Sequence, residues 1–397
     1  EMLRSLVGSE MCIRDRYKIV LCAPTGRAAK RMSETTGEEA STLHRLLEIG
    51  KVDEESLFKK DNEYQGAPID GDIIIVDEVS MVDMFIMSYL LDCIYQGTKL
   101  ILVGDSDQLP SVGPGSVLKD LIASEKIVTV HLDKIFRQAA KSKIIVNAHR
   151  VNNGKGFISK EDPELEEDAN QDFFFIKENN QEKILKEVLS LCNGRLKNFG
   201  EYDFFENIQV LTPTKKGLLG TKELNKALQE ELNPHREGEA EKSSMGAIFR
   251  IGDRVMQIKN NYDMYWERLC ESGVETGNGI FNGETGIITN INEKGKILSV
   301  KFDDEKVCKY EFNDLEQIEH SYCMTIHKAQ GSEFDVVIMI VPQAAPMLLT
   351  RNLLYTGLTR AKKLLIVIGN DRVVDYMIKN VDSKKRNTGL EFKLRNM

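Results

Sequence analysis

The chain has 397 residues, of which 41% are hydrophobic and 29% are charged, and its formal net charge is −9. This length is enough for about two to three domains with full cores. The longest apolar runs are of strand length, far short of the roughly 20 residues that a membrane helix needs. The seven cysteines are scattered without a C-x-x-C pair, which argues against a zinc site or a disulfide framework and favours a cytoplasmic protein. The negative charge argues against nucleic-acid binding by the whole surface, but it allows a local basic groove.

The chain first shows a recognisable pattern at Lys18. Residues 1–16 form no element and look foreign to the rest of the chain, so we expect a non-native leader; they hold no apolar segment with a small-residue cleavage site that would mark a signal peptide. Strands then alternate with helical stretches, which predicts a parallel, doubly wound sheet over residues 17–135. The four expected strands lie at residues 18–22, 73–76, 99–103 and 127–132.

The run Ile73–Val76 consists of β-branched residues and predicts a strand that is buried on both faces. Asp77 and Glu78 follow it directly, at the carboxyl end of the strand, where open α/β sheets bind their ligands. Asp77 would hold Mg²⁺, usually through water, and Glu78 would polarise the water that attacks a γ-phosphate. The alternative is a strand that happens to end in an acidic turn.

Two further strand ends carry polar residues. Gln108 is the last residue of the segment Gly104-Asp105-Ser106-Asp107-Gln108. From this position its side chain could reach a γ-phosphate or the attacking water. The alternative is that the segment is only a Gly/Pro-rich turn. Pro24, Thr25 and Arg27 follow the first strand and lead into a basic helix. Such a loop is a good phosphate contact, but an ordinary strand-to-helix turn has the same composition.

The second half of the chain repeats this theme. A strand at Ile208–Leu211 ends in Thr212-Pro213-Thr214-Lys215-Lys216-Gly217, again a Pro-Thr turn followed by basic residues. Two such turns indicate two similar domains, each of which touches a polyanion. The pattern resumes at residues 320–397, whose basic tail Lys384–Arg386 we expect to be solvated.

Residues 246–319 follow a different pattern, with short strands separated by Gly, Asn and Asp turns. This spacing predicts a small antiparallel β-barrel inserted into the second domain. A loop over residues 260–280 holds Tyr262, Tyr265 and the only tryptophan, Trp266. These aromatic side chains are either stacking platforms for bases or a local hydrophobic anchor.

Six segments in chain order resemble the motifs of the RecD/TraA group of superfamily 1 helicases, which move 5′→3′ on single-stranded DNA. The resemblance covers roughly residues 18–370, and IIIVDEVSM is similar to the Walker B motif of that group. The other five segments are CAPTGRAAKRM, VGDSDQLPSVGPG, IFRQ, TIHKAQGSEFD and YTGLTRAKKLLIV.

The resemblance implies an α/β fold with two RecA-like parallel-sheet domains, residues 17–135 and residues 136–245 with 320–397, and with the barrel inserted in the second. It implies ATP and Mg²⁺ as cofactors, single-stranded DNA, duplex junctions and proteins of a repair complex as candidate partners, and no membrane. The implied catalytic residues are Asp77 (also the metal ligand), Glu78, Gln108 and the arginine fingers Arg137 and Arg360. The implied nucleotide contacts are Gly104, Asp105, Gly331 and Glu333, and the implied DNA contacts are Pro24, Thr25, Arg27, His44, Thr212, Pro213, Lys215, Thr325 and His327.

One departure from the family is serious, because no G-x-x-x-x-G-K-[ST] loop occurs in the chain. That loop binds the β- and γ-phosphates and supplies a hydroxyl to Mg²⁺. We therefore expect a chain truncated through its nucleotide site, with weak or absent ATP hydrolysis. Two interpretations stay open: an incomplete ATP-dependent 5′→3′ DNA helicase or translocase of repair or recombination, and a catalytically inactive module that binds single-stranded DNA. The presence of all five implied catalytic residues favours the first.

Overall fold

The computed structural model describes residues 17–49, 67–132, 141–159, 162, 169–270, 273–381, 386 and 388–397. These residues form two compact units. Unit 1 contains the described residues up to Leu132 together with Arg386 and Thr388–Met397, and unit 2 contains those from Lys141 to Val381. Within the described ranges, no helix has both the length and the apolar character to cross a membrane.

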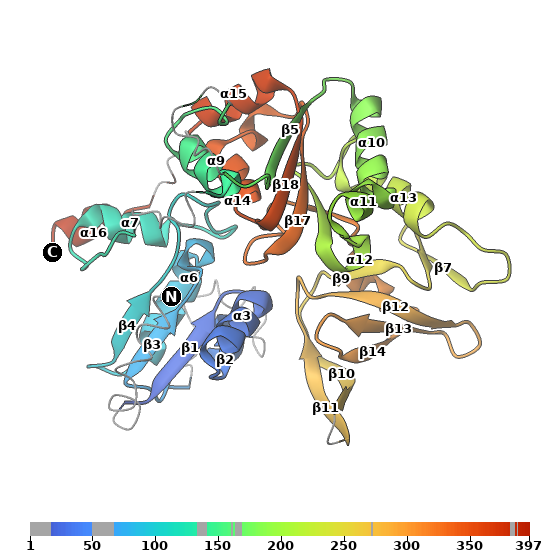
Figure 1. Cartoon of the computed structure of the whole chain (residues 1–397). Helices are drawn as coiled ribbons and strands as arrows, with labels where there is room; N and C mark the ends of the chain where they lie inside the picture. The colour runs from blue at the N-terminus through green and yellow to red at the C-terminus, as the bar shows by residue number, and fades with distance from the viewer. Residues whose placement is uncertain are drawn as a thin grey trace. The chain divides into compact units, whose positions relative to one another are not determined.

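Unit 1 is built on a four-stranded parallel sheet with the order β2-β1-β3-β4. Its strands β1, β3 and β4 run side by side in Figure 1. Ile74 and Val76 of β3 are completely buried, because helices supply Leu43, Leu90 and Val117 to the same core. Ile73 and Ile75 on the other face are only half-buried, so the expected burial of this strand on both faces is wrong. The elements are β1 (Ile19–Ala23), α3 (Gly26–Thr36), β2 (Ala40–Thr42), α4 (Leu43–Leu46), β3 (Ile73–Val76), the 3₁₀ turn η2 (Val79–Met81), α6 (Met84–Cys93), β4 (Lys99–Leu102) and α7 (Val117–Ser124).

The strand expected at residues 127–132 is wrong. This segment has no regular secondary structure, and Val128 and Val130 are 95% and 79% exposed. Its β-branched composition suits a strand, but β-propensity mostly reflects packing against neighbouring strands. No described strand pairs with this segment.

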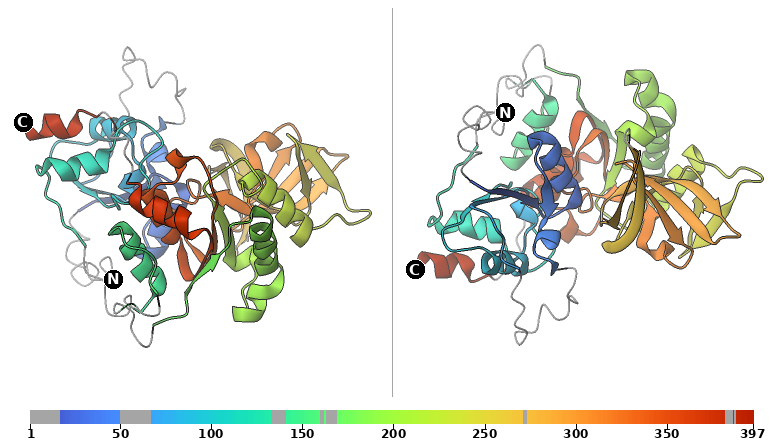
Figure 2. Two further views of the ribbon diagram at one scale, coloured as in Figure 1. Left: turned by 90° about the horizontal axis from the view of Figure 1, so that it is seen from above. Right: turned by 90° about the horizontal axis from the view of Figure 1, so that it is seen from below.

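Of the basic tail, Lys384 and Lys385 lie outside the described residues, and Arg386 is exposed, as a solvated tail requires, but the residues after it are folded. Helix α16 (Leu390–Arg395) packs against α7, as Figures 1 and 2 show. Arg386 donates hydrogen bonds to the loop that precedes α7. The last residues of the chain therefore fold as part of unit 1, although unit 2 lies before them in the sequence.

Unit 2 contains a five-stranded parallel sheet with the order β16-β6-β17-β18-β5. All five residues of β6 are buried, as its central place in an α/β sheet requires. The elements of this part are α9 (Lys143–Asn152), β5 (Phe173–Lys177), α10 (Gln181–Ser190), η3 (Leu191–Arg195), α11 (Leu196–Gly200), α12 (Phe204–Asn207), β6 (Ile208–Thr212), α13 (Thr221–Leu232), β16 (Cys323–Thr325), β17 (Phe334–Val341), η5 (Pro346–Leu348), α14 (Arg351–Leu358), β18 (Ala361–Gly369) and α15 (Asp371–Lys379).

Antiparallel strands are inserted between α13 and β16. Seven of them form one sheet with the order β11-β10-β14-β13-β12-β9-β15, and β7 and β8 pair as a separate hairpin. Since β11 and β15 are the two ends of this order, the expected closed barrel is not confirmed. The elements are β7 (Glu241–Ser244), β8 (Ala247–Arg250), β9 (Arg254–Gln257), β10 (Asn261–Cys270), β11 (Gly273–Ile280), β12 (Thr285–Asn292), β13 (Ile297–Phe302), β14 (Val307–Glu311), η4 (Leu315–Gln317) and β15 (Ile318–His320).

The expected aromatic loop at residues 260–280 is a long antiparallel hairpin formed by β10 and β11. Trp266 packs against the core of the inserted sheet, and the Lys306 ammonium lies 5.1 Å from the centre of its ring. The Tyr262 ring meets Phe281 edge-on at 5.5 Å. These contacts favour the hydrophobic anchor over a platform for bases, although Tyr265 remains 52% exposed.

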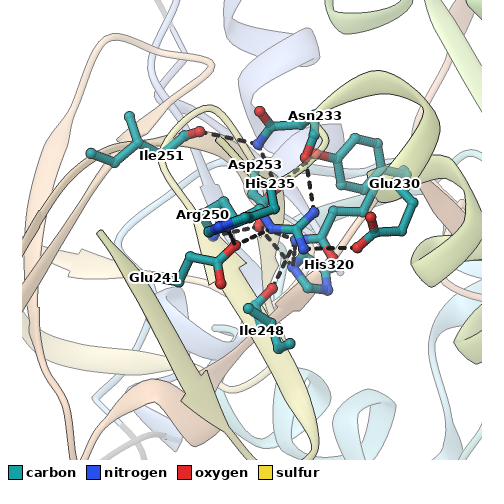
Figure 3. Close-up of polar contacts among 11 residues, drawn as sticks. Glu230, Asn233, His235, Glu241, Ile248, Arg250, Ile251, Asp253 and His320 are labelled. Atoms are coloured by element: carbon teal, nitrogen blue, oxygen red, sulfur yellow. Dashed lines mark hydrogen bonds and ion pairs between the residues drawn. The ribbon is translucent and has the colours of Figure 1, made fainter. Parts of the chain in front are cut away.

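The completely buried carboxylate of Asp253 joins the inserted strands to the parallel sheet (Figure 3). Helix α13 supplies Gln229 Nε2, which donates to Oδ2 at 2.6 Å, and Asn233 Nδ2, which donates to Oδ1 at 2.8 Å just after the helix ends. The Tyr322 hydroxyl donates to Oδ1 at 2.8 Å, and His320 Nε2 lies 3.0 Å from Oδ2. A buried carboxylate is stable only when its oxygens are hydrogen-bonded in this way.

Replacing Asp253 by alanine leaves these buried donors without acceptors. We expect the Asp253→Ala variant to lose about 3–5 kcal/mol of the free energy of unfolding, measured by urea denaturation, since uncompensated buried polar groups are costly. The control is Asp263→Ala on the exposed side of β10, which should change stability by less than about 0.5 kcal/mol. Equal stability of the two variants would show that Asp253 does not hold the inserted strands.

Candidate functional site

In unit 1, the carboxyl ends of the neighbouring strands β3 and β4 carry the predicted nucleotide residues. The Asp77 amide donates to Cys22 O of β1 at 3.0 Å, and the Val79 amide donates to Val103 O at the end of β4 at 2.9 Å. The end of β3 is therefore fixed between its two neighbours. We call Asp77, Glu78, Asp105 and Gln108, which follow β3 and β4, the carboxylate edge.

Asp77 and Glu78 differ in their backbone geometry. The Asp77 side chain is half-buried, and its Oδ1 accepts a hydrogen bond from the Glu78 amide at 2.8 Å. Glu78 has φ 54° and ψ 39°, the left-handed conformation that costs a residue with a side chain roughly 1–2 kcal/mol. Strain of this kind persists only where surrounding contacts enforce it, and it is common at functional sites.

Gly104 lets the ends of β3 and β4 approach each other. A Cβ atom at this position would lie 3.0 Å from Val79 N and 3.2 Å from Ser80 N, so a larger residue would push the two ends apart. Beyond it, Asp105 Oδ1 accepts from the Asp107 amide at 2.9 Å, and Gln108 Nε2 lies 3.4 Å from Asp105 Oδ2. Gln108 is thus held beside Asp105 on the carboxylate edge, and the direct nucleotide contact of Gly104 and Asp105 stays a prediction.

The predicted DNA residues of unit 1 surround the end of β1. Thr25 is the N-cap of α3, and its Oγ1 accepts from the Ala28 amide at 3.2 Å. Pro24 and Arg27 flank it and are half-buried, and His44 lies in the first turn of α4. The N-terminus of α3 and Arg27 offer positive charge at this end of the sheet, as a phosphate contact requires.

In unit 2, the carboxyl ends of β6, β16 and β17 border a pocket of about 660 Å³. We call it the strand-end pocket. It brings together four of the predicted DNA residues, Pro213, Lys215, Thr325 and His327. Its other lining residues are Gln181, Thr214, Lys216, Gly217, Leu218, Leu219, Pro342, Gln343, Ala344, Ala345 and Leu348.

Lys215 and Lys216 supply positive charge to this pocket, and His327 also lines it. The His327 side chain is exposed, and partial desolvation at the pocket wall and, to a smaller extent, the positive charge of Lys215 lower its pKa from the usual 6.5. His327 is therefore neutral at pH 7 and can donate or accept a hydrogen bond at the pocket wall. Pro213, Leu218, Leu219 and Leu348 supply apolar walls to the same pocket.

Thr212 does not present its hydroxyl to the pocket. Its side chain is completely buried, and Oγ1 donates to Leu219 O at 2.7 Å. The hydroxyl closes the loop between β6 and α13, and the DNA contact of Thr212 stays a prediction. Thr212 shapes the loop that presents Lys215.

Arg360 is also turned inward. It is 3% exposed, its Nε donates to Thr356 O at 3.0 Å, and its Nη1 donates to Ser332 O at 3.0 Å. In this conformation the guanidinium connects α14 to the segment that contains Gly331 and Glu333, and it is not exposed to a ligand as an arginine finger would be. Glu333 pairs with Lys362 at 3.6 Å. Arg137 lies outside the described residues.

Part of the strand-end pocket was not predicted. Gln181 opens α10, and residues 342–345 and Leu348 follow β17. A signal was available, because the segment Pro342-Gln343-Ala344-Ala345-Pro346 directly follows a buried strand, and in a parallel sheet it must reach the same edge as the loop after β6.

Comparison with known proteins places these features in a family. Residues 224–302 match the family model described as the SH3 domain of ATP-dependent RecD-like DNA helicases. Residues 2–164 match an AAA domain, and residues 320–368 match a UvrD-like helicase C-terminal domain. The ATP-dependent RecD2 DNA helicase of Deinococcus radiodurans is 36% identical over 349 residues, which are 87% of this chain and 42% of that protein. The chain belongs to the RecD-like helicase family.

A second relative and a solved structure show lower similarity. The RecBCD subunit RecD of Mycolicibacterium smegmatis is 29% identical over 404 residues, or 95% of this chain and 66% of that protein. Among solved structures, a Pif1 helicase described for unwinding of forked double-stranded DNA has 18% identity and a TM-score of 0.48, covering 92% of this chain and 84% of that one. The chain spans less than half the length of its RecD2 relative.

The left-handed backbone of Glu78 can be tested directly. Glycine adopts this conformation without a steric penalty and alanine does not, so Glu78→Gly should be more stable than Glu78→Ala by about 1 kcal/mol in urea denaturation. The matched control is Lys119 in the helix α7. There the order should be reversed, so that Lys119→Gly is less stable than Lys119→Ala by about 1 kcal/mol. The same order at both positions would contradict the strained geometry of Glu78.

The lowered pKa of His327 predicts how stability depends on pH. Below its unfolded-state pKa of 6.5, the unfolded chain binds a proton that the folded chain does not, so stability falls as the pH decreases. The His327→Gln variant lacks this contribution. Urea denaturation at about pH 8 and about pH 5 should therefore show the wild type losing more stability than the variant. An equal loss in both proteins would contradict the lowered pKa of His327.

Proposed function

We propose that this chain contributes the single-stranded-DNA contacts and part of the nucleotide site of an ATP-dependent 5′→3′ DNA helicase or translocase. The observation that carries this proposal is the strand-end pocket, where Lys215, Lys216 and His327 lie at the carboxyl ends of parallel strands. Membership of the RecD-like helicase family supports it. Its place would be DNA repair or recombination in the cytoplasm, with duplex junctions and repair-complex proteins as partners.

The chemistry of the pocket suits a nucleic-acid strand. Lys215 and Lys216 can bind phosphate oxygens, while the neutral His327 and Thr214 can donate hydrogen bonds to them. The apolar walls from Pro213 and Leu218 can pack against sugars or bases. Contacts of this kind provide affinity without sequence preference, as a motor that moves along any sequence needs.

The carboxylate edge fits the metal and water side of an ATP site. Mg²⁺ prefers carboxylate oxygens and typically takes one or two of them together with substrate phosphates, and Asp77 offers such a ligand at the end of β3. When bound, Mg²⁺ would neutralise charge on the phosphates. Glu78 would orient and accept a proton from the attacking water, and Gln108 would fix the position of that water.

A phosphate-binding G-x-x-x-x-G-K-[ST] loop is absent from the 397 residues. We accordingly expect this polypeptide to hydrolyse ATP weakly or not at all. The inward conformation of Arg360 supports the same expectation, because the guanidinium must leave two carbonyl oxygens before it can reach a phosphate. Together these two features also support the second candidate function, a module that binds single-stranded DNA without ATP turnover.

The DNA contact is tested by the salt dependence of binding. Lys215→Ala should weaken binding of single-stranded oligonucleotides of any sequence, and it should lower the slope of log K against log salt by about 0.7, since one phosphate contact is lost. Fluorescence anisotropy with labelled oligonucleotides measures both quantities. Lys226→Ala, an exposed lysine of α13 outside the pocket, is the control and should leave the slope unchanged. An unchanged slope for Lys215→Ala would refute the proposed contact.

A further inference from the structure

Three backbone carbonyl oxygens of unit 1 converge on the guanidinium of Arg386. Arg386 Nη1 donates to Gly113 O and Gly115 O, both at 2.7 Å, and Nη2 donates to Ser111 O at 2.6 Å. The Ser111 hydroxyl oxygen lies 3.3 Å from Nη1. The loop and the arginine are separated by more than 270 positions in the chain, so folding of the last residues brings them together.

The two glycines give the Ser111–Gly115 loop its shape. A Cβ on Gly113 would lie 1.9 Å from Asp83 Oδ2, and Gly115 has φ +95° with Met84 Cγ 2.1 Å from its virtual Cβ. Pro114 O accepts a hydrogen bond from the Met84 amide at 3.0 Å. The loop is therefore packed tightly against the start of α6, and carbonyl oxygens from three of its residues meet at Arg386.

A guanidinium fits this cradle better than other cations do. It presents five N–H donors in a rigid plane, whereas a lysine ammonium is a compact charge with three donors on a flexible chain. The same tail makes two further contacts with α7, through the Thr388 hydroxyl and the Asp120 carboxylate and through Arg395 Nη2 and Ala123 O at 2.6 Å. Among the tail residues that the structure describes, Arg386 is the one that contacts the loop between Gln108 and α7.

We propose that Arg386 is a positioning residue for the carboxylate edge. Gln108 precedes Ser111 by three positions, and the far side of the loop rests on the start of α6, the helix that comes after Asp77 and Glu78. By holding the loop, Arg386 fixes Gln108 relative to the end of β3. The role of Gln108 toward an attacking water rests on the proposed function, but the control of its loop by Arg386 does not.

With this role, the C-terminal tail would help to position a residue of the proposed nucleotide site. The chain leaves unit 1 after Leu132, builds unit 2 and returns to unit 1 in the tail, of which Arg386 is the first described residue. This residue makes the contact that holds the Gln108 loop. A change that detaches Arg386 would release this loop without altering any residue of the carboxylate edge.

Hydrogen exchange measured by NMR or mass spectrometry on the full 397-residue chain tests the proposal without ATP or DNA. The reporters are the amides of Met84, Asp107 and Gln108, whose acceptors are Pro114 O, Asp105 Oδ1 and Asp105 O. Arg386→Ala should accelerate their exchange by at least about tenfold, because loss of the cation frees the loop to open locally. Millimolar guanidinium ion should restore part of the protection in this variant, a rescue that general destabilisation of the unit would not show.

The matched control is Arg395→Ala, which removes the same charge from the same tail but leaves the loop contact intact. It should change exchange at the three reporters by less than about twofold. Arg386→Lys serves if the alanine variant does not fold, and it should show intermediate protection. Unchanged exchange in the Arg386 variants, or an equal increase in Arg395→Ala, would overturn the proposal. Failure of DNA or nucleotide binding with the exchange result intact would overturn only the proposed function.

Discussion

The parallel pairing of buried strands determines where the polar residues of this chain can meet. In unit 1, β1, β3 and β4 point the same way, so the loops that leave them lie at one edge of the sheet. In unit 2, the same constraint gathers the loops after β6, β16 and β17 around the strand-end pocket. The residues proposed to bind Mg²⁺, water and DNA all lie on segments that this geometry brings to strand ends.

The sequence was sufficient to locate these strand ends, because their signals are local. A β-branched run followed by Asp77-Glu78, or a strand followed by Pro213 and Lys215, can be recognised within about ten residues. Long-range packing was not predictable in this way. The burial of Arg360 depends on Ser332 O, and the attachment of Arg386 depends on a loop more than 270 positions earlier.

The orientation of a side chain also cannot be predicted from the local sequence pattern. Thr212 and Lys215 belong to the same Pro-Thr turn, yet the first is completely buried and the second lines the pocket. The hydrogen bond from Thr212 to Leu219 O forms only once the loop has closed. The prediction of a strand at residues 127–132 was wrong for a related reason, since a strand needs a neighbouring strand to pair with as well as β-branched residues.

Asp253 connects the inserted strands to two of the segments that border the strand-end pocket. Helix α13 begins directly after the pocket loop and holds Asp253 through Gln229, and Tyr322 holds it one position before β16, which leads to Thr325 and His327. The inserted sheet is therefore fastened to the elements that present the pocket residues.

We propose that single-stranded DNA contacts the strand ends of unit 1 and those of unit 2. Photocrosslinking with an oligonucleotide that carries a halogenated thymidine analogue, followed by peptide mapping, tests it most directly. We expect crosslinked peptides to contain residues 213–219 and 325–327 in unit 2 and the segment from Pro24 to His44 in unit 1. Crosslinks that avoid all three segments, with binding retained in the Lys215→Ala variant, would contradict the account.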